Sequence, residues 1–172
     1  AKTVIAMAKS FCEGLDSVGM AATGKHFPGH GAVVADSHLE LPVDARTLKT
    51  LEAADLKPFV ALIKSGIPSL MMAHIRYTDF DQTPASLSKK WIGTYLRKKL
   101  GYKGAVFCDD LSMGGAAVVG GYDERARLAL AAGCDMLPVC NNRPALLQLL
   151  KDLKKLKPSA ASSARLKKLY HA

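Results

Sequence analysis

Apolar positions along the chain follow two different periods, and the changes of period predict alternating helices and strands. Apolar side chains at every third or fourth position are typical of amphipathic helices, and short continuous apolar runs are typical of buried strands. The predicted helices cover residues 2–18, 47–65, 88–100, 122–132, 144–153 and 160–170, and the predicted strands cover residues 20–27, 67–74, 104–108 and 134–140.

This order, one helix followed by four strand–helix repeats and a closing helix, predicts an α/β fold with a parallel sheet covered by helices. A doubly wound sheet and a (β/α)₈ barrel both fit the alternation. Four strands cannot close an eight-stranded barrel, which needs about 250 residues, whereas this chain has 172. No Gly-x-Gly-x-x-Gly follows any predicted strand, which weakens a dinucleotide-binding interpretation.

Composition narrows the class of protein. Hydrophobic residues make up 49% of the chain and charged residues 23%, which is typical of a globular domain. No apolar run reaches the roughly 20 residues of a spanning helix, and no signal peptide precedes the first helix, so we expect a soluble cytoplasmic protein. The net charge of +9 comes from lysines and arginines on helix faces with few aromatic residues between them, which argues against nucleic acid as a partner.

A dense group of polar residues follows the first predicted strand: Lys25, His26, His30, Asp36 and His38. In one interpretation Asp36 orients the imidazole of His38, which then gives or takes a proton. In a second, the histidines and Asp36 bind a metal ion such as zinc. In a third, these side chains only hydrogen-bond the backbone of their loop. Sequence spacing alone leaves all three open.

Two adjacent carboxylates, Asp109 and Asp110, end the apolar strand at residues 104–108. Side chains alternate along a strand, so the two carboxylates must point in different directions. An ionised aspartate at the mouth of a barrel is a competent nucleophile toward a glycosidic carbon, and the other carboxylate can bind backbone amides of the next turn. We assign the chemical role to Asp109 and the structural role to Asp110.

These motifs resemble those of the bacterial β-N-acetylglucosaminidases of glycoside hydrolase family 3. The resemblance runs over essentially all 172 residues. The matching segments are Gly24–Gly31 with Asp36–His38, Phe107–Met113, Ala132–Met136, Val139–Asn142 and Leu169–His171.

The resemblance implies a (β/α)₈ barrel, of which residues 1–172 form a single partial domain with four parallel strands, numbers 5 to 8. The completing N-terminal half is absent from this chain, and that half supplies further sugar-binding groups in the family. We expect strand residues such as Leu70, Met72 and Val106 to face this missing half.

The implied activity is retaining exo-hydrolysis of terminal β-linked N-acetylglucosamine from muropeptides during cytoplasmic recycling of peptidoglycan. Asp109 is the implied nucleophile, and His38 with Asp36 is the implied acid and base. Lys25 and His26 are the implied ligands of sugar hydroxyls. No metal or organic cofactor is implied.

Two alternatives to this activity remain at the level of sequence. One is a metal-dependent hydrolase on the same half-barrel scaffold. The other is an inactive half-barrel that only binds a partner. The resemblance favours the glycosidase, with the missing half-barrel as partner and a muropeptide as substrate.

Overall fold

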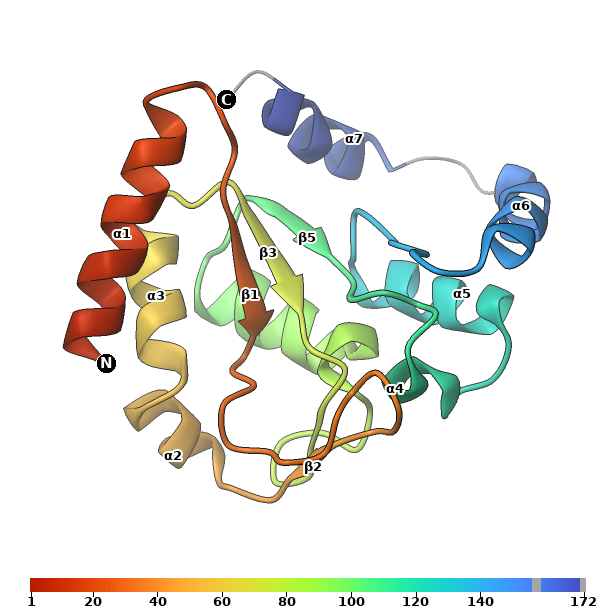
Figure 1. The fold of residues 1–172 in the computed structure, drawn as a ribbon, viewed down its shortest axis with the longest axis horizontal. Helices are drawn as coiled ribbons and strands as arrows, with labels where there is room; N and C mark the ends of the chain where they lie inside the picture. The colour runs from red at the N-terminus through yellow and green to blue at the C-terminus, as the bar shows by residue number, and fades with distance from the viewer. Residues whose placement is uncertain (156–158, 171–172) are drawn as a thin grey trace.

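Three parallel strands form the centre of the molecule in a computed structural model that describes residues 1–155 and 159–170. The strands are β1 (Thr23–Phe27), β3 (Ser69–Met72) and β5 (Ala105–Phe107), in the order β1-β3-β5 (Figure 1). The register places Gly24 opposite Leu70 and Leu70 opposite Val106. The predicted α/β class with parallel strands is confirmed.

Helices and one small second sheet surround this centre. Strands β2 (Val43–Asp44) and β4 (Arg76–Tyr77) pair in parallel. The α-helices are α1 (Lys2–Asp16), α2 (Leu48–Ala53), α3 (Leu56–Lys64), α4 (Gly114–Ala117), α5 (Tyr122–Ala132), α6 (Arg143–Asp152) and α7 (Ala160–Lys167). A π-helix, η2 (Lys90–Lys99), and short 3₁₀ turns η1 (Ala85–Leu87), η3 (Leu153–Lys155) and η4 (Lys168–Tyr170) complete the set.

The prediction of one helix over residues 47–65 is wrong in one respect, because the structure divides it into α2 and α3. Thr47 accepts a hydrogen bond from the amide of Thr50 and so caps α2. The division falls at Ala54 and Asp55, where the carboxylate of Asp55 accepts hydrogen bonds from the guanidinium of Arg46. An ion pair between residues nine positions apart therefore coincides with the break in the predicted helix.

The predicted fourth strand at residues 134–140 is also corrected. This segment runs beside β5 and forms a single bridge, Phe107 to Met136. The amide of Leu111 donates to the carbonyl of Pro138, but Pro138 has no amide hydrogen with which to continue the ladder. The amide of Cys140 donates instead to the carboxylate of Asp110. Within the described residues the main sheet therefore has three regular strands rather than four.

The expectation that Leu70, Met72 and Val106 face a missing half is wrong. All three are fully buried in the chain's own hydrophobic core. Neighbouring side chains on a strand point to opposite faces, and Met71, between Leu70 and Met72, is half-buried and lines a cleft. Strand residues that alternate with these core residues, such as Met71, therefore point to the face of the sheet that borders the cleft.

Helix α1 carries apolar side chains that the described residues do not cover. Val4, Met7 and Phe11 lie at helical spacing and are 56%, 69% and 69% exposed. The adjacent side of the helix, with Ala8 and Leu15, packs against the core. Helix α1 lies beside α3 at the edge of the molecule next to β1 (Figure 1).

Helix α7 is fixed to the sheet by a buried carboxylate. Asp135 accepts hydrogen bonds from Arg97, from Arg165 of α7 and from the amide of Val106. Of the C-terminal motif, Tyr170 is exposed in η4, and His171 lies outside the described residues. Across residues 1–155 and 159–170, no helix has the length and apolar character to cross a membrane.

Candidate active site

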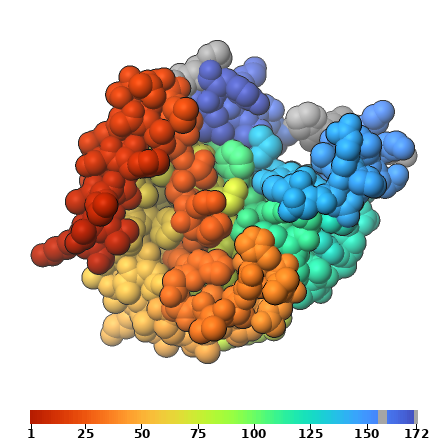
Figure 2. Space-filling model, viewed as in Figure 1, coloured from red at the N-terminus to blue at the C-terminus, as the bar shows by residue number. Residues whose placement is uncertain are grey.

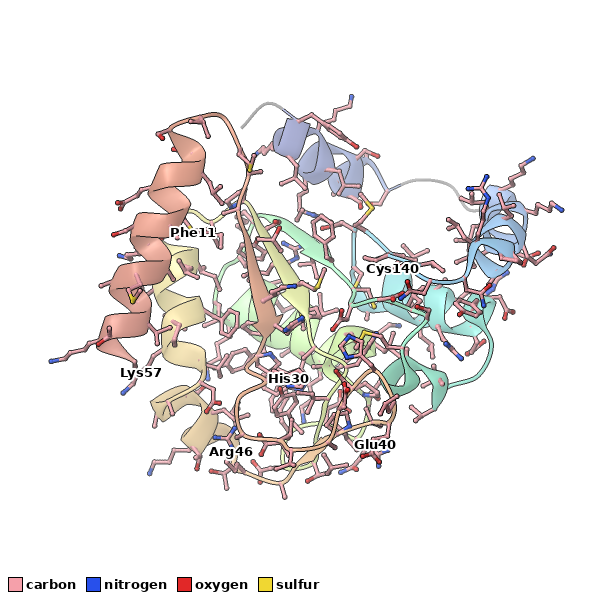
Figure 3. The ribbon with its side chains drawn as sticks, in the orientation of Figure 1. Phe11, His30, Glu40, Arg46, Lys57 and Cys140 are labelled. Carbon is pink, nitrogen blue, oxygen red and sulfur yellow. The ribbon has the colours of Figure 1, made fainter. Side chains whose placement is uncertain are left out.

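An open cleft of about 1510 Å³ lies where strands β1 and β5 end. The long loop from Pro28 to Arg46, orange in Figure 2, forms one wall, and α1 and α3 form another. Figure 3 labels Phe11 on α1, His30 near the centre and Cys140 across the sheet, and all three line the cleft. The polar lining includes Lys25, His26, His30, Asp36, Ser37, His38, Asp55, Asp109, Asp110, Cys140 and Asn141.

The carboxylates of Asp109 and Asp110 have different surroundings. Asp110 accepts hydrogen bonds from the amide and hydroxyl of Ser112 and from the amide of Cys140. Burial raises the pKa of Asp110, but these hydrogen bonds outweigh it and lower the pKa overall. Asp109 accepts one hydrogen bond, at Oδ1 from the amide of Asp110. Its Oδ2 lies 3.8 Å from Nε2 of His26 and faces the cleft.

Asp36 and His38 form a hydrogen-bonded pair in the loop. Oδ1 of Asp36 lies 2.9 Å from the amide nitrogen of His38 and 2.7 Å from its Nδ1. The amide and then the imidazole of His38 lower the pKa of Asp36. Because an ionised carboxylate only accepts hydrogen bonds, Nδ1 carries the proton and Nε2 is free to exchange one. The two side chains are 57% and 73% exposed toward the cleft.

His26 lies deeper in the cleft than His38. Burial is the main cause of its lowered pKa, and the positive charge of Lys25 lowers the pKa further, while Asp109 acts in the opposite direction. His26 is therefore neutral near pH 7, and its contact with Asp109 is that of an uncharged imidazole with a carboxylate. Lys25, on the same strand, is exposed at the cleft.

The base of the loop is fixed by charged and hydroxyl groups that come from several elements. The guanidinium of Arg46 donates to the carboxylates of Asp44 and Asp55 at 2.7–3.1 Å. The hydroxyl of Tyr77 donates to the carbonyl of Gly29. A methyl group at Gly29 would lie 2.7 Å from Cβ of Asp55, so this close approach requires glycine.

His74, which follows β3, supports the segment of Asp109 from beneath. Its side chain is completely buried. Nε2 donates to the carbonyl of Asp110 at 3.0 Å, and Nδ1 lies 2.6 Å from the hydroxyl of Ser86. Burial is the main reason that the pKa of His74 is lowered. The imidazole is therefore neutral, with Nδ1 accepting from Ser86.

The structure brings the predicted site residues into one cleft but not into one cluster. Asp36 pairs with His38, and His26 lies near Asp109, as two separate contacts. No three His, Cys, Asp or Glu side chains converge as a metal site within the described ranges. Sequence reasoning gave no role to His74 or Ser86, because their contacts join segments separated in sequence. It also gave none to Arg46, although its partners Asp44 and Asp55 are only two and nine positions away.

The chain matches the family model described as glycosyl hydrolase family 3 N terminal domain over residues 1–169. It is 52% identical over 161 residues to a beta-hexosaminidase of Tolumonas auensis, covering 93% of this chain and 48% of that protein. It is 50% identical over 163 residues to a beta-hexosaminidase of Methylococcus capsulatus, covering 95% of this chain and 49% of that protein. The chain thus spans about half the length of these curated relatives.

A solved structure supports the same relationship. NagZ from Neisseria gonorrhoeae, in complex with N-trifluoroacetyl-D-glucosamine, superposes with a TM-score of 0.87 at 42% sequence identity. The match covers 98% of this chain and 48% of that chain. The family resemblance stated from the motifs is therefore confirmed, and the similar portion again amounts to about half of the solved chain.

Proposed function

We propose, for a chain that belongs to glycosyl hydrolase family 3, that its cleft hydrolyses terminal β-linked N-acetylglucosamine. The observation that carries the proposal is one cleft lined both by a lightly hydrogen-bonded carboxylate, Asp109, and by an oriented Asp36–His38 pair. Relatives named beta-hexosaminidase, and a relative in complex with an N-acylated glucosamine, support this choice of sugar.

In the first step Asp109 acts as the nucleophile. An oxygen of its carboxylate attacks the anomeric carbon, and the bond from that carbon to the leaving oxygen breaks. His38, as the imidazolium, gives the proton on Nε2 to the leaving oxygen, and Asp36 stabilises that imidazolium through Nδ1. The products are a covalent glycosyl ester on Asp109 and a free alcohol.

In the second step water attacks the same carbon from the side vacated by the alcohol. Neutral His38 removes a proton from that water, and the ester bond to Asp109 breaks. Two inversions give net retention of configuration. The acid and base in this scheme is an imidazole, in place of the carboxylic acid found in most retaining glycosidases.

Lys25 and His26 are proposed to hold hydroxyl groups of the sugar. Both line the cleft on β1, and Nε2 of His26 lies 3.8 Å from Oδ2 of Asp109. A neutral imidazole carries one donor and one acceptor, and a lysine ammonium carries three donors, so the two together suit adjacent hydroxyl groups. Asp110, with its carboxylate already occupied by Ser112 and Cys140, holds the turn.

The biological substrate that we propose is a muropeptide, degraded in the cytoplasm during peptidoglycan recycling. The proposed active form contains a further N-terminal segment that adds the remaining strands of a barrel, so that residues 1–172 supply strands 5 to 8. The uncovered apolar side of α1 and the half-length match to relatives support this completion.

The test is turnover of a chromogenic β-N-acetylglucosaminide by the active protein that contains this chain. Asp109→Asn should abolish turnover, and a mechanism-based fluoro-sugar should leave a covalent adduct on Asp109. Asp110→Asn is the matched control, and we expect it to lower stability without removing the trapping site. An adduct mapped to Asp110 would show that the two roles are reversed.

The metal-dependent alternative is tested in the same assay. Treatment with EDTA should leave turnover unchanged, because the proposed steps use only Asp109, Asp36 and His38. Inhibition by EDTA that zinc reverses would favour the metal site. A protein with no turnover in any assembly would favour the inactive half-barrel.

A further inference from the structure

The loop that carries Asp36 and His38 is bound at its tip by the segment that follows Asp109. The amide of Gly114 donates to the carbonyl of His38 at 2.8 Å, and the amide of Gly115 donates to the carbonyl of Ser37 at 3.0 Å. Both donors open helix α4. Figure 3 shows Glu40, at the tip of this loop, on the side of the molecule where α4 lies.

The two backbones approach so closely that neither donor position has room for a side chain. A methyl group at Gly114 would lie 2.2 Å from the carbonyl oxygen of Leu39. A methyl group at Gly115 would lie 2.8 Å from Cβ of His74 and 3.1 Å from the carbonyl oxygen of Ser37. Neither glycine has a positive φ. Close packing, against the loop at Gly114 and against both His74 and the loop at Gly115, is therefore what requires glycine here, rather than backbone conformation.

The groups on both sides of the contact between the loop and Gly115 are well fixed. Ser37 is 4% exposed, and its hydroxyl is hydrogen-bonded to Nε2 of His30 at 3.1 Å. On the other side of Gly115, buried His74 is bound to Ser86 and to the carbonyl of Asp110. The backbone of the loop is therefore held between fixed groups, while the side chains of the pair reach the cleft.

We propose that Gly114 and Gly115 are positioning residues that set where the Asp36–His38 pair stands relative to Asp109. The proposal rests on the proposed function, in which His38 transfers a proton to the leaving oxygen. The amide of Gly114 holds the carbonyl of His38 itself, so any displacement of this contact moves the imidazole. A displacement of about 1 Å in a reacting group can cost about 100-fold in rate.

The experiment compares Gly114→Ala and Gly115→Ala with Gly93→Ala in the active protein. Gly93 lies in η2, has no atom within 4 Å of an added methyl group and has no positive φ, so it is the matched control. Each variant is assayed on an activated aryl N-acetylglucosaminide and on an alkyl N-acetylglucosaminide, whose leaving oxygen needs protonation. Gly115→Ala is the milder crowding, and it keeps the test open where Gly114→Ala does not fold.

We expect kcat/KM for the alkyl substrate to fall about 100-fold in the two variants, with a much smaller loss on the aryl substrate and none in Gly93→Ala. We also expect faster hydrogen exchange at the amides of Leu39 and Glu40, which donate to the carbonyl of Asp36 in the loop. This second measurement is independent of activity.

Equal losses on both substrates, or unchanged turnover on both, would overturn the positioning role. His38→Ala separates this outcome from a failure of the proposed function. If His38→Ala leaves turnover of the aryl substrate nearly unchanged while the glycine variants reduce it, only the inference about the glycines fails. If His38→Ala affects both substrates equally, the proton-transfer role of His38 itself fails.

Discussion

At the scale of single residues, Asp109 and Asp110 are neighbours whose carboxylates have different numbers of donors. Alternation along a strand predicted that the two would diverge. It could not show which one would be held, because a donor to Asp110 comes from Cys140, thirty positions away. The assignment of Asp110 to the turn agrees with these contacts, and the nucleophilic role of Asp109 stays a prediction.

His38 should matter in proportion to how much protonation the leaving group needs. We expect His38→Ala to slow hydrolysis of alkyl N-acetylglucosaminides by roughly 100-fold or more, within the usual range for general acid catalysis. For activated aryl substrates, whose leaving groups depart as stable anions, the rate of the first step should fall far less. Asp36→Ala should show a milder form of the same pattern, because it removes the acceptor that orients Nδ1. The measurement is kcat/KM across a series of leaving groups.

His74 should make the folded protein sensitive to mild acid. The pKa of an unfolded histidine is about 6.5, and burial lowers that of His74 in the folded chain. Below about pH 6.5 the unfolded chain binds a proton that folded His74 does not. Its contribution to stability is therefore complete above that pH and is lost as the pH falls toward the lower folded pKa, by up to about 1.4 kcal/mol per pH unit.

The measurement for His74 is the melting temperature of the active protein between pH 7.5 and pH 5. His74→Gln, which keeps a donor for the carbonyl of Asp110, should flatten the decrease with falling pH. His30→Gln is the comparison at a half-buried histidine. His26, whose pKa is also lowered by burial, remains in both variants. An identical decrease in wild type and His74→Gln would contradict the linkage to His74.

At the scale of elements, the sequence was most informative where one periodic segment corresponds to one element. Residues 122–132 form α5 with the predicted ends, and Gly133 follows it with a φ of 111°. The errors occur where a side-chain contact or a proline interrupts the regular pattern. The contact of Asp55 with Arg46 marks the break between α2 and α3, and Pro138 with the carboxylate of Asp110 ends the pairing of residues 134–140.

The polar residues of the loop from Pro28 to Arg46 were predicted as candidate site groups, but the contacts that anchor this loop were not predictable. Arg46 lies two positions after Asp44 and nine before Asp55, and this spacing does not by itself show that its guanidinium bridges both carboxylates. The same holds for Gly114 and Gly115, whose close approach to the loop depends on the tertiary fold. Sequence reasoning thus found candidate groups of the cleft and missed the groups that hold them.

Removal of the Arg46 side chain should destabilise the loop strongly. The carboxylate of Asp44 is 4% exposed, and the hydrogen bonds from Arg46 lower its pKa against the opposing effect of burial. Breaking a fully buried ion pair costs about 3–5 kcal/mol. Because Arg46 itself is 32% exposed, Arg46→Leu should lower the free energy of unfolding by at most about this amount. Lys99→Leu is the control, since its pair with Glu52 is exposed and should contribute less than about 1 kcal/mol.

Urea denaturation of the two variants checks this difference. Arg46→Leu should also reduce turnover, because Arg46 closes the loop that carries Asp36 and His38. Similar midpoints for Arg46→Leu and Lys99→Leu would show that Asp44 and Asp55 find other partners or become solvated.

At the scale of the whole molecule, the described residues bury a hydrophobic core of their own but leave apolar side chains exposed beside a strand edge. Leu70, Met72 and Val106 are buried without help from another segment. In contrast, β1 is an edge strand, and the exposed side chains of Met7 and Phe11 line the same cleft as its residues. An unpaired strand edge beside an apolar helix face is a template for another strand.

This arrangement predicts how residues 1–172 behave alone. The uncovered apolar groups of α1 and the free edge of β1 should make the isolated chain associate with itself, because association removes both from water. Size-exclusion chromatography with light scattering should show dimers or larger species. An N-terminal half-barrel supplied by co-expression should give a defined complex with glycosidase activity, since the proposed segment covers the same surface.

A matched pair of variants tests which surface causes the self-association of the isolated chain. Phe11→Glu, at a position 69% exposed in the cleft, should reduce self-association of the isolated chain and also weaken its complex with the N-terminal half. Leu150→Glu, 55% exposed on α6, should change neither, because α6 does not line the cleft. A monodisperse and fully active monomer of residues 1–172 would contradict the half-barrel prediction, because a site that is complete by itself needs no second segment.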